Sequence, residues 1–205
     1  DGSGDTTGLL HCLEWRAAAL ANEPGSLKSE EWLILRDQQG VGDILAENVT
    51  AAGGQVRVVD VIGRPTQNIQ SGVLQVDPKQ PSDFKKLLET WVQSPADRRR
   101  IVYLWSLDAE LGQQTSLESL SHDQELLCGS VLHLIQAMAG MDGEQPEFYL
   151  VTRGAQAVGQ ESGPLSPVQA LLWGLGRTAN NEYADIQCRL VDIDWNMDSQ
   201  GVEKL

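Results

Sequence analysis

The sequence has few of the residues from which metal sites and disulfide frameworks are built. Its 205 residues include three cysteines and three histidines. No two cysteines form a C-x-x-C pair, and the histidines lack the spacing of metal ligands. We therefore expect no metal site, and we interpret the cysteines as reduced, mostly buried thiols of a cytosolic protein. The residues concerned are Cys12, Cys128, Cys188, His11, His122 and His133.

The sequence also lacks a long hydrophobic run and an excess of positive charge. No apolar stretch approaches the ~20 residues of a membrane-spanning helix, and the opening DGSGDTTG has no signal-peptide character. Asp and Glu number 29 against 15 Lys and Arg, which gives a net charge of −14. Because such a surface repels a phosphate backbone, we expect no nucleic-acid partner, no membrane partner and a cytoplasmic location.

What the sequence does contain is an alternation of short apolar runs and helical stripes. Strands are expected at 9–16, 32–35, 56–61, 73–76, 101–105, 148–151 and 187–193. Helices are expected at 41–52, from about Ser82, along the stripe Leu127, Val131, Leu134 and Met138, and at 167–182, with a loop at 108–121. This alternation predicts an α/β fold, a Rossmann-like, mostly parallel sheet flanked by helices. Residues 9–195 are expected to form one domain, with 1–8 and 196–205 as linkers.

The segment Gly174-Leu175-Gly176-Arg177-Thr178-Ala179 has the G-x-G-x-x-A spacing of a dinucleotide-binding turn. Such a turn must connect a strand to a helix, so that free N–H groups at the helix N-terminus meet the pyrophosphate. Here Ser166 and Pro167 instead mark the start of a helix that runs straight through the motif. We therefore predict that Gly174 and Gly176 lie inside a helix, serve close packing and bind no cofactor.

A better candidate turn follows the strand at 32–35. Gly40 and Gly42 are predicted to connect that strand to a helix, and Asp60 comes 20 residues after Gly40, where a ribose-binding acid is expected. The third glycine position holds Leu45, which would obstruct close contact between helix and strand. The pattern leaves open a site with the two glycines under the phosphates and Asp60 on the ribose.

Catalytic constellations are missing from the sequence. Short-chain reductases need a Tyr and a Lys one helical turn apart, because the ammonium lowers the phenol pKa for proton transfer. None of Tyr103, Tyr149 and Tyr183 has a lysine four residues on, and no G-x-S-x-G elbow or P-loop is present. We therefore predict no catalytic residue and no cofactor-binding residue in this chain.

Other polar residues and the tryptophans have structural interpretations that we favour over functional ones. Asp192 and Asp194 could hold Mg²⁺ at a strand end, but an acidic turn is favoured. Arg98–Arg100 could bind phosphate, but a solvated face or pairing with acidic residues is favoured. His133 is interpreted as a structural histidine. The core anchors are expected to be Trp15, Trp32, Trp91, Trp105, Trp173 and Trp195.

Three segments of the chain resemble a known family. They are LEWRAA near the start, YLVTRGAQAV at 149–158, and PVQALLWGLGRTANNEYADIQCRLVDID at 167–194. Over residues 9–195 the chain is similar to the N-terminal structural subdomain of the ketoreductase region in modular type I polyketide synthases. The resemblance implies a truncated, short-chain-reductase-like fold that stabilises a separate catalytic subdomain, and it carries no catalytic residue onto this chain.

The resemblance also implies the surroundings of the chain. NADPH would be bound by the partner catalytic subdomain, so this chain would not itself be the enzyme, while its parent would be an acyltransferase-type megasynthase. Further partners would be dehydratase, enoylreductase or methyltransferase domains and an acyl carrier protein. A related subdomain occurs in animal-type fatty acid synthases as part of a pseudo-ketoreductase. Two alternatives stay open: a pseudo-ketoreductase half beside an enoylreductase or C-methyltransferase, and an autonomous NAD(P)-binding enzyme that uses the Gly40–Gly42 turn.

Overall fold

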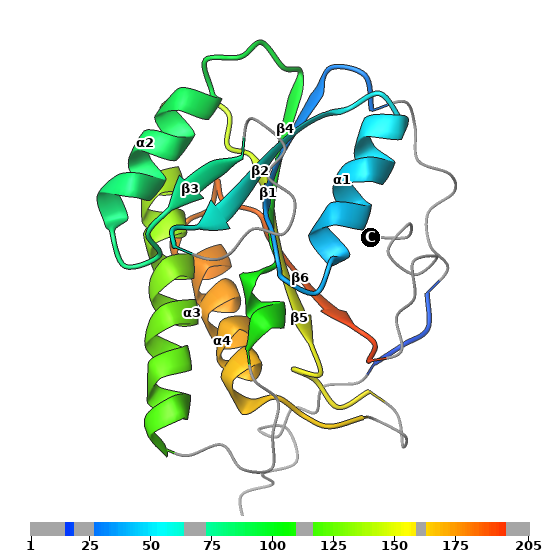
Figure 1. The fold of residues 1–205 in the computed structure, drawn as a ribbon, viewed down its shortest axis with the longest axis vertical. Coiled ribbons are helices and arrows are strands. Elements are labelled where there is room, and N and C mark those ends of the chain that lie inside the picture. Colours follow the sequence, from blue (N-terminus) through cyan, green and yellow to red (C-terminus); the bar gives the residue numbers. More distant parts are fainter. Residues whose placement is uncertain (1–14, 19–26, 64–72, 110–116, 159–162, 196–205) are drawn as a thin grey trace, which may run out of the picture.

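The computed structural model describes residues 15–18, 27–63, 73–109, 117–158 and 163–195. They form a six-stranded sheet in the order β3-β2-β1-β4-β5-β6, in which every neighbouring pair is parallel (Figure 1). The strands are β1 Glu30–Leu35, β2 Gln55–Val61, β3 Leu74–Val76, β4 Arg98–Tyr103, β5 Glu147–Arg153 and β6 Cys188–Ile193. The helices are α1 Val41–Ala51, α2 Pro81–Trp91, α3 Leu117–Ala139, α4 Pro167–Glu182 and the 3₁₀ helix η2 Trp105–Asp108. This strand order is that of a Rossmann-type sheet, so the predicted fold class is confirmed.

The side chains of the central strands alternate between two cores. Leu33 and Leu35 of β1 pack in a core shared with α2, α3 and α4, whereas Trp32 and Ile34 pack in a smaller core with α1. Figure 1 shows α1 on one side of the sheet and the other three α-helices on the opposite side. Right-handed crossovers produce this division, because the chain moves from β1 to β2 in one direction and from β3 to β4 in the other.

The largest differences from the predicted boundaries are at β4 and α3. β4 begins at Arg98, three residues before the predicted start, and ends at Tyr103, so that Trp105 lies in η2 and not in the strand. The helix α3 begins at Leu117, inside the predicted loop 108–121. Its first turns contain mostly polar residues, and the two leucines there, Leu117 and Leu120, are too few to mark an apolar stripe.

Some predictions fall on residues that the structure does not describe. These are the two linkers and most of the predicted strand at 9–16, of which Trp15 and Arg16 are described and have no strand pairing. Within the described ranges, no helix is both long enough and apolar enough to cross a membrane.

Ion pairs join the strands at the amino-terminal edge of the sheet. The buried carboxylate of Glu31 accepts hydrogen bonds from Arg57 Nε at 2.9 Å and from Ser94 Oγ at 3.1 Å, and it lies 3.8 Å from Arg99 Nε. Because Glu31 is on β1 while Arg57 and Arg99 are on β2 and β4, this one carboxylate ties three neighbouring strands together.

The arginines at the start of β4 all pair with carboxylates. Arg100 reaches both Glu30 and Glu147, the latter at 3.1 Å, and its guanidinium lies 4.9 Å from the centre of the Trp32 ring. Arg98 pairs with Glu30 at 3.8 Å. These pairs match the favoured interpretation of Arg98–Arg100 as partners for acidic residues, and they explain how a charged stretch can begin a central strand.

Glu31→Gln removes the charge that holds Arg57 and Arg99. Removing one partner of a buried ion pair costs about 3–5 kcal/mol, but the side chain of Arg57 is 37% exposed and water will partly replace the lost pair. We therefore expect the free energy of unfolding to fall by about 2 kcal/mol in urea denaturation. The control Glu89→Gln breaks the exposed pair with Lys85 and should cost under about 0.5 kcal/mol. Equal losses in the two variants would contradict this role of Glu31.

Candidate functional site

The strand order reverses between β1 and β4, whose carboxyl ends lie side by side. From β1 the chain continues to β2 on one side, while from β4 it continues to β5 on the other. In open α/β sheets ligands bind at such a switch point, because the diverging connections leave a crevice. The predicted turn with Gly40 and Gly42 lies here between β1 and α1, and Asp60 lies near the end of the adjacent β2.

Glycine is needed at both positions of this turn, at one for its backbone conformation and at the other for space. Gly40 is the N-cap of α1 and has a φ of 94°, which favours glycine. A Cβ atom on Gly42 would lie 3.0 Å from Arg36 Cγ and 3.1 Å from Leu104 Cδ1, so glycine allows α1 to approach the ends of β1 and β4. Leu45, at the third glycine position, is buried in the core beneath α1. The backbone of the turn is preserved, whereas the fingerprint is incomplete.

Three N–H groups of the turn donate to a carboxylate of the chain itself. Asp37 is 3% exposed, and its Oδ1 accepts a hydrogen bond from Gly42 N at 2.7 Å. Its Oδ2 accepts from Gln39 N at 3.0 Å and from Val41 N at 3.2 Å. In a dinucleotide site these amides would face the pyrophosphate. Asp37 therefore occupies the anion position at the start of α1.

A second carboxylate closes the same turn from η2. Asp108 Oδ1 accepts from Gln38 N at 2.7 Å, and the side-chain amide of Gln39 donates to Leu107 O. The 3₁₀ helix is thereby bound to the turn across the switch point. Sequence reasoning does not single out either acid. An Asp shortly before a helix is a recognisable signal for its N-terminus, but no local pattern connects Gln38 to a residue 70 positions away.

Asp60 lies near the end of β2, as predicted, but both of its carboxylate oxygens already accept hydrogen bonds within the chain. Arg36 Nε donates to Asp60 Oδ1 at 3.0 Å and Arg36 Nη2 to Oδ2 at 2.6 Å, which is a bidentate pair. Arg36 Nη1 reaches Asp43 at 2.8 Å. Chiefly through the hydrogen bonds to Asp60, the pKa of Arg36 is raised above its ordinary value. A ribose would have to displace a guanidinium that two carboxylates hold.

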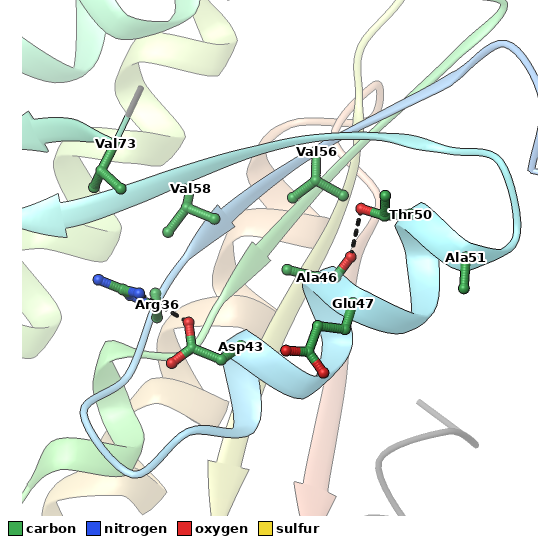
Figure 2. Close-up of a pocket in the computed structure, with 9 residues that line it drawn as sticks. All are labelled: Arg36, Asp43, Ala46, Glu47, Thr50, Ala51, Val56, Val58 and Val73. Carbon is green, nitrogen blue, oxygen red and sulfur yellow. Dashed lines mark hydrogen bonds and ion pairs between the residues drawn. The ribbon is translucent and has the colours of Figure 1, made fainter. Parts of the chain in front are cut away.

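A groove of about 580 Å³ lies beside this turn, along the flank of α1 (Figure 2). Val56 and Val58 of β2 line it on the sheet side, and Figure 2 shows Asp43 and Glu47 of α1 on the opposite side. Its remaining lining residues are Arg36, Ala46, Thr50, Ala51 and Val73. The groove combines apolar residues with carboxylates and offers no pairing of a nucleophile with a base.

Asp192 lies in β6 and not in the predicted acidic turn, and its carboxylate links that strand to the end of β5 and to the loop after it. Its Oδ1 accepts from Thr152 Oγ1 at 2.7 Å and from Ala155 N at 3.0 Å, and its Oδ2 accepts from Gln156 N at 2.9 Å. In the described part of the chain, no three His, Cys, Asp or Glu side chains come together as a group that could hold a metal ion.

The tyrosines of the strands are placed for packing. Tyr103 OH is 2.7 Å from Ser130 Oγ inside the larger core. Tyr149 OH donates to Glu147 at 2.9 Å, and burial raises the pKa of Tyr149, with the neighbouring carboxylate acting in the same direction. A catalytic tyrosine needs the opposite shift. His133 Nδ1 lies 3.2 Å from Pro78 O and its ring packs near Phe84, as expected for a structural histidine.

The cysteines and tryptophans mostly follow the sequence expectations. Burial raises the pKa of Cys188 to about 12 and also raises that of Cys128, so both thiols are held protonated. Two tryptophans are not core anchors as predicted. Trp15 is half-exposed and its ring meets Trp173 edge-on at 5.8 Å. Trp195 is only partly buried and donates from Nε1 to Pro164 O at 2.9 Å. Cys12 and His11 lie outside the described residues, as does the side chain of His122.

Gly174 and Gly176 lie inside α4, as predicted, but only one of them serves close packing within this chain. A Cβ on Gly176 would come within 2.5 Å of Leu190 Cδ2 and 3.1 Å of Cys188 Sγ. At Gly174 no described atom lies within 4 Å of the Cβ position, so the packing interpretation is wrong for this residue. Gly174 faces away from the sheet.

The same substitution at these two glycines should have opposite effects. Gly176→Leu forces a side chain into the contact between α4 and β6, and we expect the free energy of unfolding to fall by about 2 kcal/mol. Gly174→Leu adds a better helix former in open space and should raise it by roughly 0.5–1 kcal/mol. Urea denaturation of both variants measures the difference, and a loss of stability at Gly174 would contradict the geometry.

These observations define the class of the protein as a Rossmann-type domain in which the chain's own Asp37 carboxylate accepts the hydrogen bonds of the dinucleotide-type turn. The family model for "Polyketide synthase extender module SpnB, Rossmann fold domain" matches residues 13–205. The chain therefore belongs to this family of polyketide synthase Rossmann domains.

Curated relatives agree with this family. The chain is 42% identical over 74 residues to the polyketide synthase GfsA of Streptomyces halstedii, which is 36% of this chain and 1% of the relative. It is 32% identical over 77 residues to the pikromycin polyketide synthase component PikAII of Streptomyces venezuelae, which is 38% of this chain and 2% of the relative. The matched segments are thus a very small part of these synthases.

Solved structures share the fold. The ketoreductase-containing structure of a keto acid-selecting NRPS module matches 90% of this chain and 15% of its own, with a TM-score of 0.74 and 20% identity. The first ketoreductase of the tylosin PKS matches 85% of this chain and 32% of its own, with a TM-score of 0.59 and 21% identity. The chain is therefore a polyketide synthase Rossmann domain with the fold of ketoreductase regions, as the resemblance of its segments predicts.

Proposed function

We propose that this chain is a non-catalytic structural subdomain, which stabilises the NADPH-dependent ketoreductase catalytic subdomain of a polyketide synthase. The observation that carries the proposal is the occupied turn. Asp37 and Asp108 accept the hydrogen bonds of its amides, and Asp60 is held by Arg36. A chain that binds no nucleotide would act in β-ketoacyl reduction only through its partner. The cytoplasmic location expected from the sequence stays a prediction.

The outer sides of α3 and α4 support a docking role. The two helices pack against each other, and they expose Leu132 at 42% and Leu171 at 43%. Near each leucine is a glycine, Gly129 or Gly174, whose Cβ position has no described atom within 4 Å. A glycine inside a helix costs about 1 kcal/mol relative to alanine, and nothing in the described part of this chain requires it at these two positions.

We propose that this surface, the α3–α4 face defined by Gly129, Leu132, Leu171 and Gly174, contacts the companion subdomain. Two exposed leucines beside two glycines let a partner bury apolar area and bring its backbone close. Docking there would leave the carboxyl edge of the sheet, with its closed turn, away from the contact. If the chain instead flanks an enoylreductase or a C-methyltransferase as a pseudo-ketoreductase half, the same face would be used but no ketone would be reduced.

An NADPH fluorescence titration tests the proposed function. The 205-residue chain is titrated alone and then together with the segment that follows it in the parent protein. We expect no saturable binding alone, and both binding and ketone reduction once the second half is added. Saturable binding to the isolated chain that is lost in Gly42→Leu would contradict the proposal and support an autonomous nucleotide-binding enzyme. Binding to the pair without ketone reduction would favour the pseudo-ketoreductase alternative.

Gly174→Leu also tests the docking surface, because the variant is expected to be stable by itself. A leucine at this position of the α3–α4 face should weaken association with the catalytic half by about tenfold or more, since the partner can no longer approach the helix closely. The matched control is Lys86→Leu, which places the same side chain on the exposed side of α2. Equal affinities for the two variants, measured by calorimetry, would place the contact elsewhere.

A further inference from the structure

The outer edge of β2 is paired over only part of its length. β3 pairs with β2 at Val59–Val61, whereas on the other side β1 pairs with it from Gln55 onward. The burial of β2 changes at the same point, since its last three residues are buried and its first four are not. Among the described residues, the stretch 55–58 therefore has a neighbouring strand on one side only.

The backbone of Val56 faces the open side of this strand. Arg36 N donates to Val59 O at 3.0 Å, so Val59 directs its polar backbone groups toward the end of β1. Successive residues of a strand direct their N–H and C=O groups to alternate sides. Val56, three residues before Val59, therefore directs its own groups away from β1. A strand edge with unpaired backbone groups is a template for one more strand.

The groove of about 580 Å³ beside α1 runs along this open edge (Figure 2). Val56 and Val58 line it from β2, and both are only partly buried. Its lining residues on α1 form one stripe at helical spacing: Asp43, Ala46, Glu47, Thr50 and Ala51. An added strand would thus find hydrogen-bonding groups on β2 and apolar area in the groove.

The charges along the groove indicate what kind of segment fits it. Glu47 is exposed and has no ion pair with a described residue. Arg36 also lines the groove, but Asp60 and Asp43 already balance its charge. Because the whole chain has a net charge of −14, a second copy would be repelled here. A lysine or arginine fits instead, since its stem can lie on the valines while its charged end reaches Glu47.

We infer that the open edge of β2 and this groove bind an extended, lysine- or arginine-bearing peptide segment from outside this chain, as an additional strand. Main-chain hydrogen bonds at Val56 hold the segment, and its alternate side chains enter the groove, as in other cases of strand addition. This surface is on the α1 side of the sheet, opposite α3 and α4 (Figure 1). The inference is therefore separate from the docking proposed for the α3–α4 face and goes beyond it.

Fluorescence anisotropy with a short labelled peptide of alternating valine and lysine tests the inference on the 205-residue chain. We expect saturable binding that is at least about tenfold tighter than binding of the matched peptide with glutamate in place of lysine. Glu47→Lys should weaken binding of the lysine peptide at least about fivefold, because like charges then meet across the groove.

The matched control is Glu89→Lys, which changes the net charge equally at an exposed position of α2, on the opposite side of the sheet. This variant should weaken binding by less than about twofold, because the distant charge is screened. Equal losses in the two variants would mean that the peptide responds only to net charge, and the inference would be wrong. Absence of saturable binding to the wild-type chain would also overturn it.

Hydrogen exchange distinguishes an added strand from a purely electrostatic contact. In the peptide complex the amide of Val56 should exchange at least about tenfold more slowly, because its N–H gains a partner. The amide of Arg57, which faces β1, should change little and serves as an internal reference. Unchanged exchange at Val56 would contradict strand addition. Neither measurement uses NADPH or the catalytic half, so failure here is distinct from failure of the proposed function.

Discussion

The hydrogen bonds between the Asp37 carboxylate and the amides of the β1–α1 turn determine what the carboxyl edge of this sheet can do. A parallel α/β sheet presents a positive helix terminus at its switch point, and in a nucleotide-binding protein that terminus meets a phosphate. Here it meets Asp37, while η2 is tied to the same turn through Asp108. The backbone of the site and its glycines are retained, but the donors are committed within the chain.

The two edges of the sheet are organised by the same kind of contact. At the amino edge Glu31 binds arginines from β2 and β4, and at the carboxyl edge Asp60 binds Arg36 in a bidentate pair. Carboxylates are abundant in a chain with a net charge of −14, and at both edges they join neighbouring strands. The helical side is different, since α3 and α4 expose Leu132 and Leu171 beside two glycines. Charge pairs therefore close the two edges of the sheet, and the α3–α4 face is the surface that we propose for association.

Local patterns predicted most of the fold and only part of the site. The helix from Pro167 was predictable because Ser166, Pro167 and an apolar stripe all mark it. The same prediction placed Gly174 and Gly176 inside a helix and not in a strand-to-helix turn. The start of β4 was not, because an arginine triplet joins a central strand only when a distant carboxylate pairs with it. The turn at Gly40 was predicted from the spacing of its glycines. The hydrogen bond from Gln38 N to Asp108 was not, because only the folded chain brings these two residues together. Local sequence patterns could not predict these hydrogen bonds and ion pairs, because their partners are far apart in the sequence.

The most direct test of this account is a titration of the ¹⁵N-labelled chain with NADPH, observed at the backbone amides of Gln39, Val41 and Gly42. If Asp37 is the ligand of the turn, these three resonances should stay unchanged at millimolar NADPH, both in the free chain and in its complex with the catalytic half. Saturable shifts at these amides would show that nucleotide displaces the carboxylate, and the turn would then be a working cofactor site.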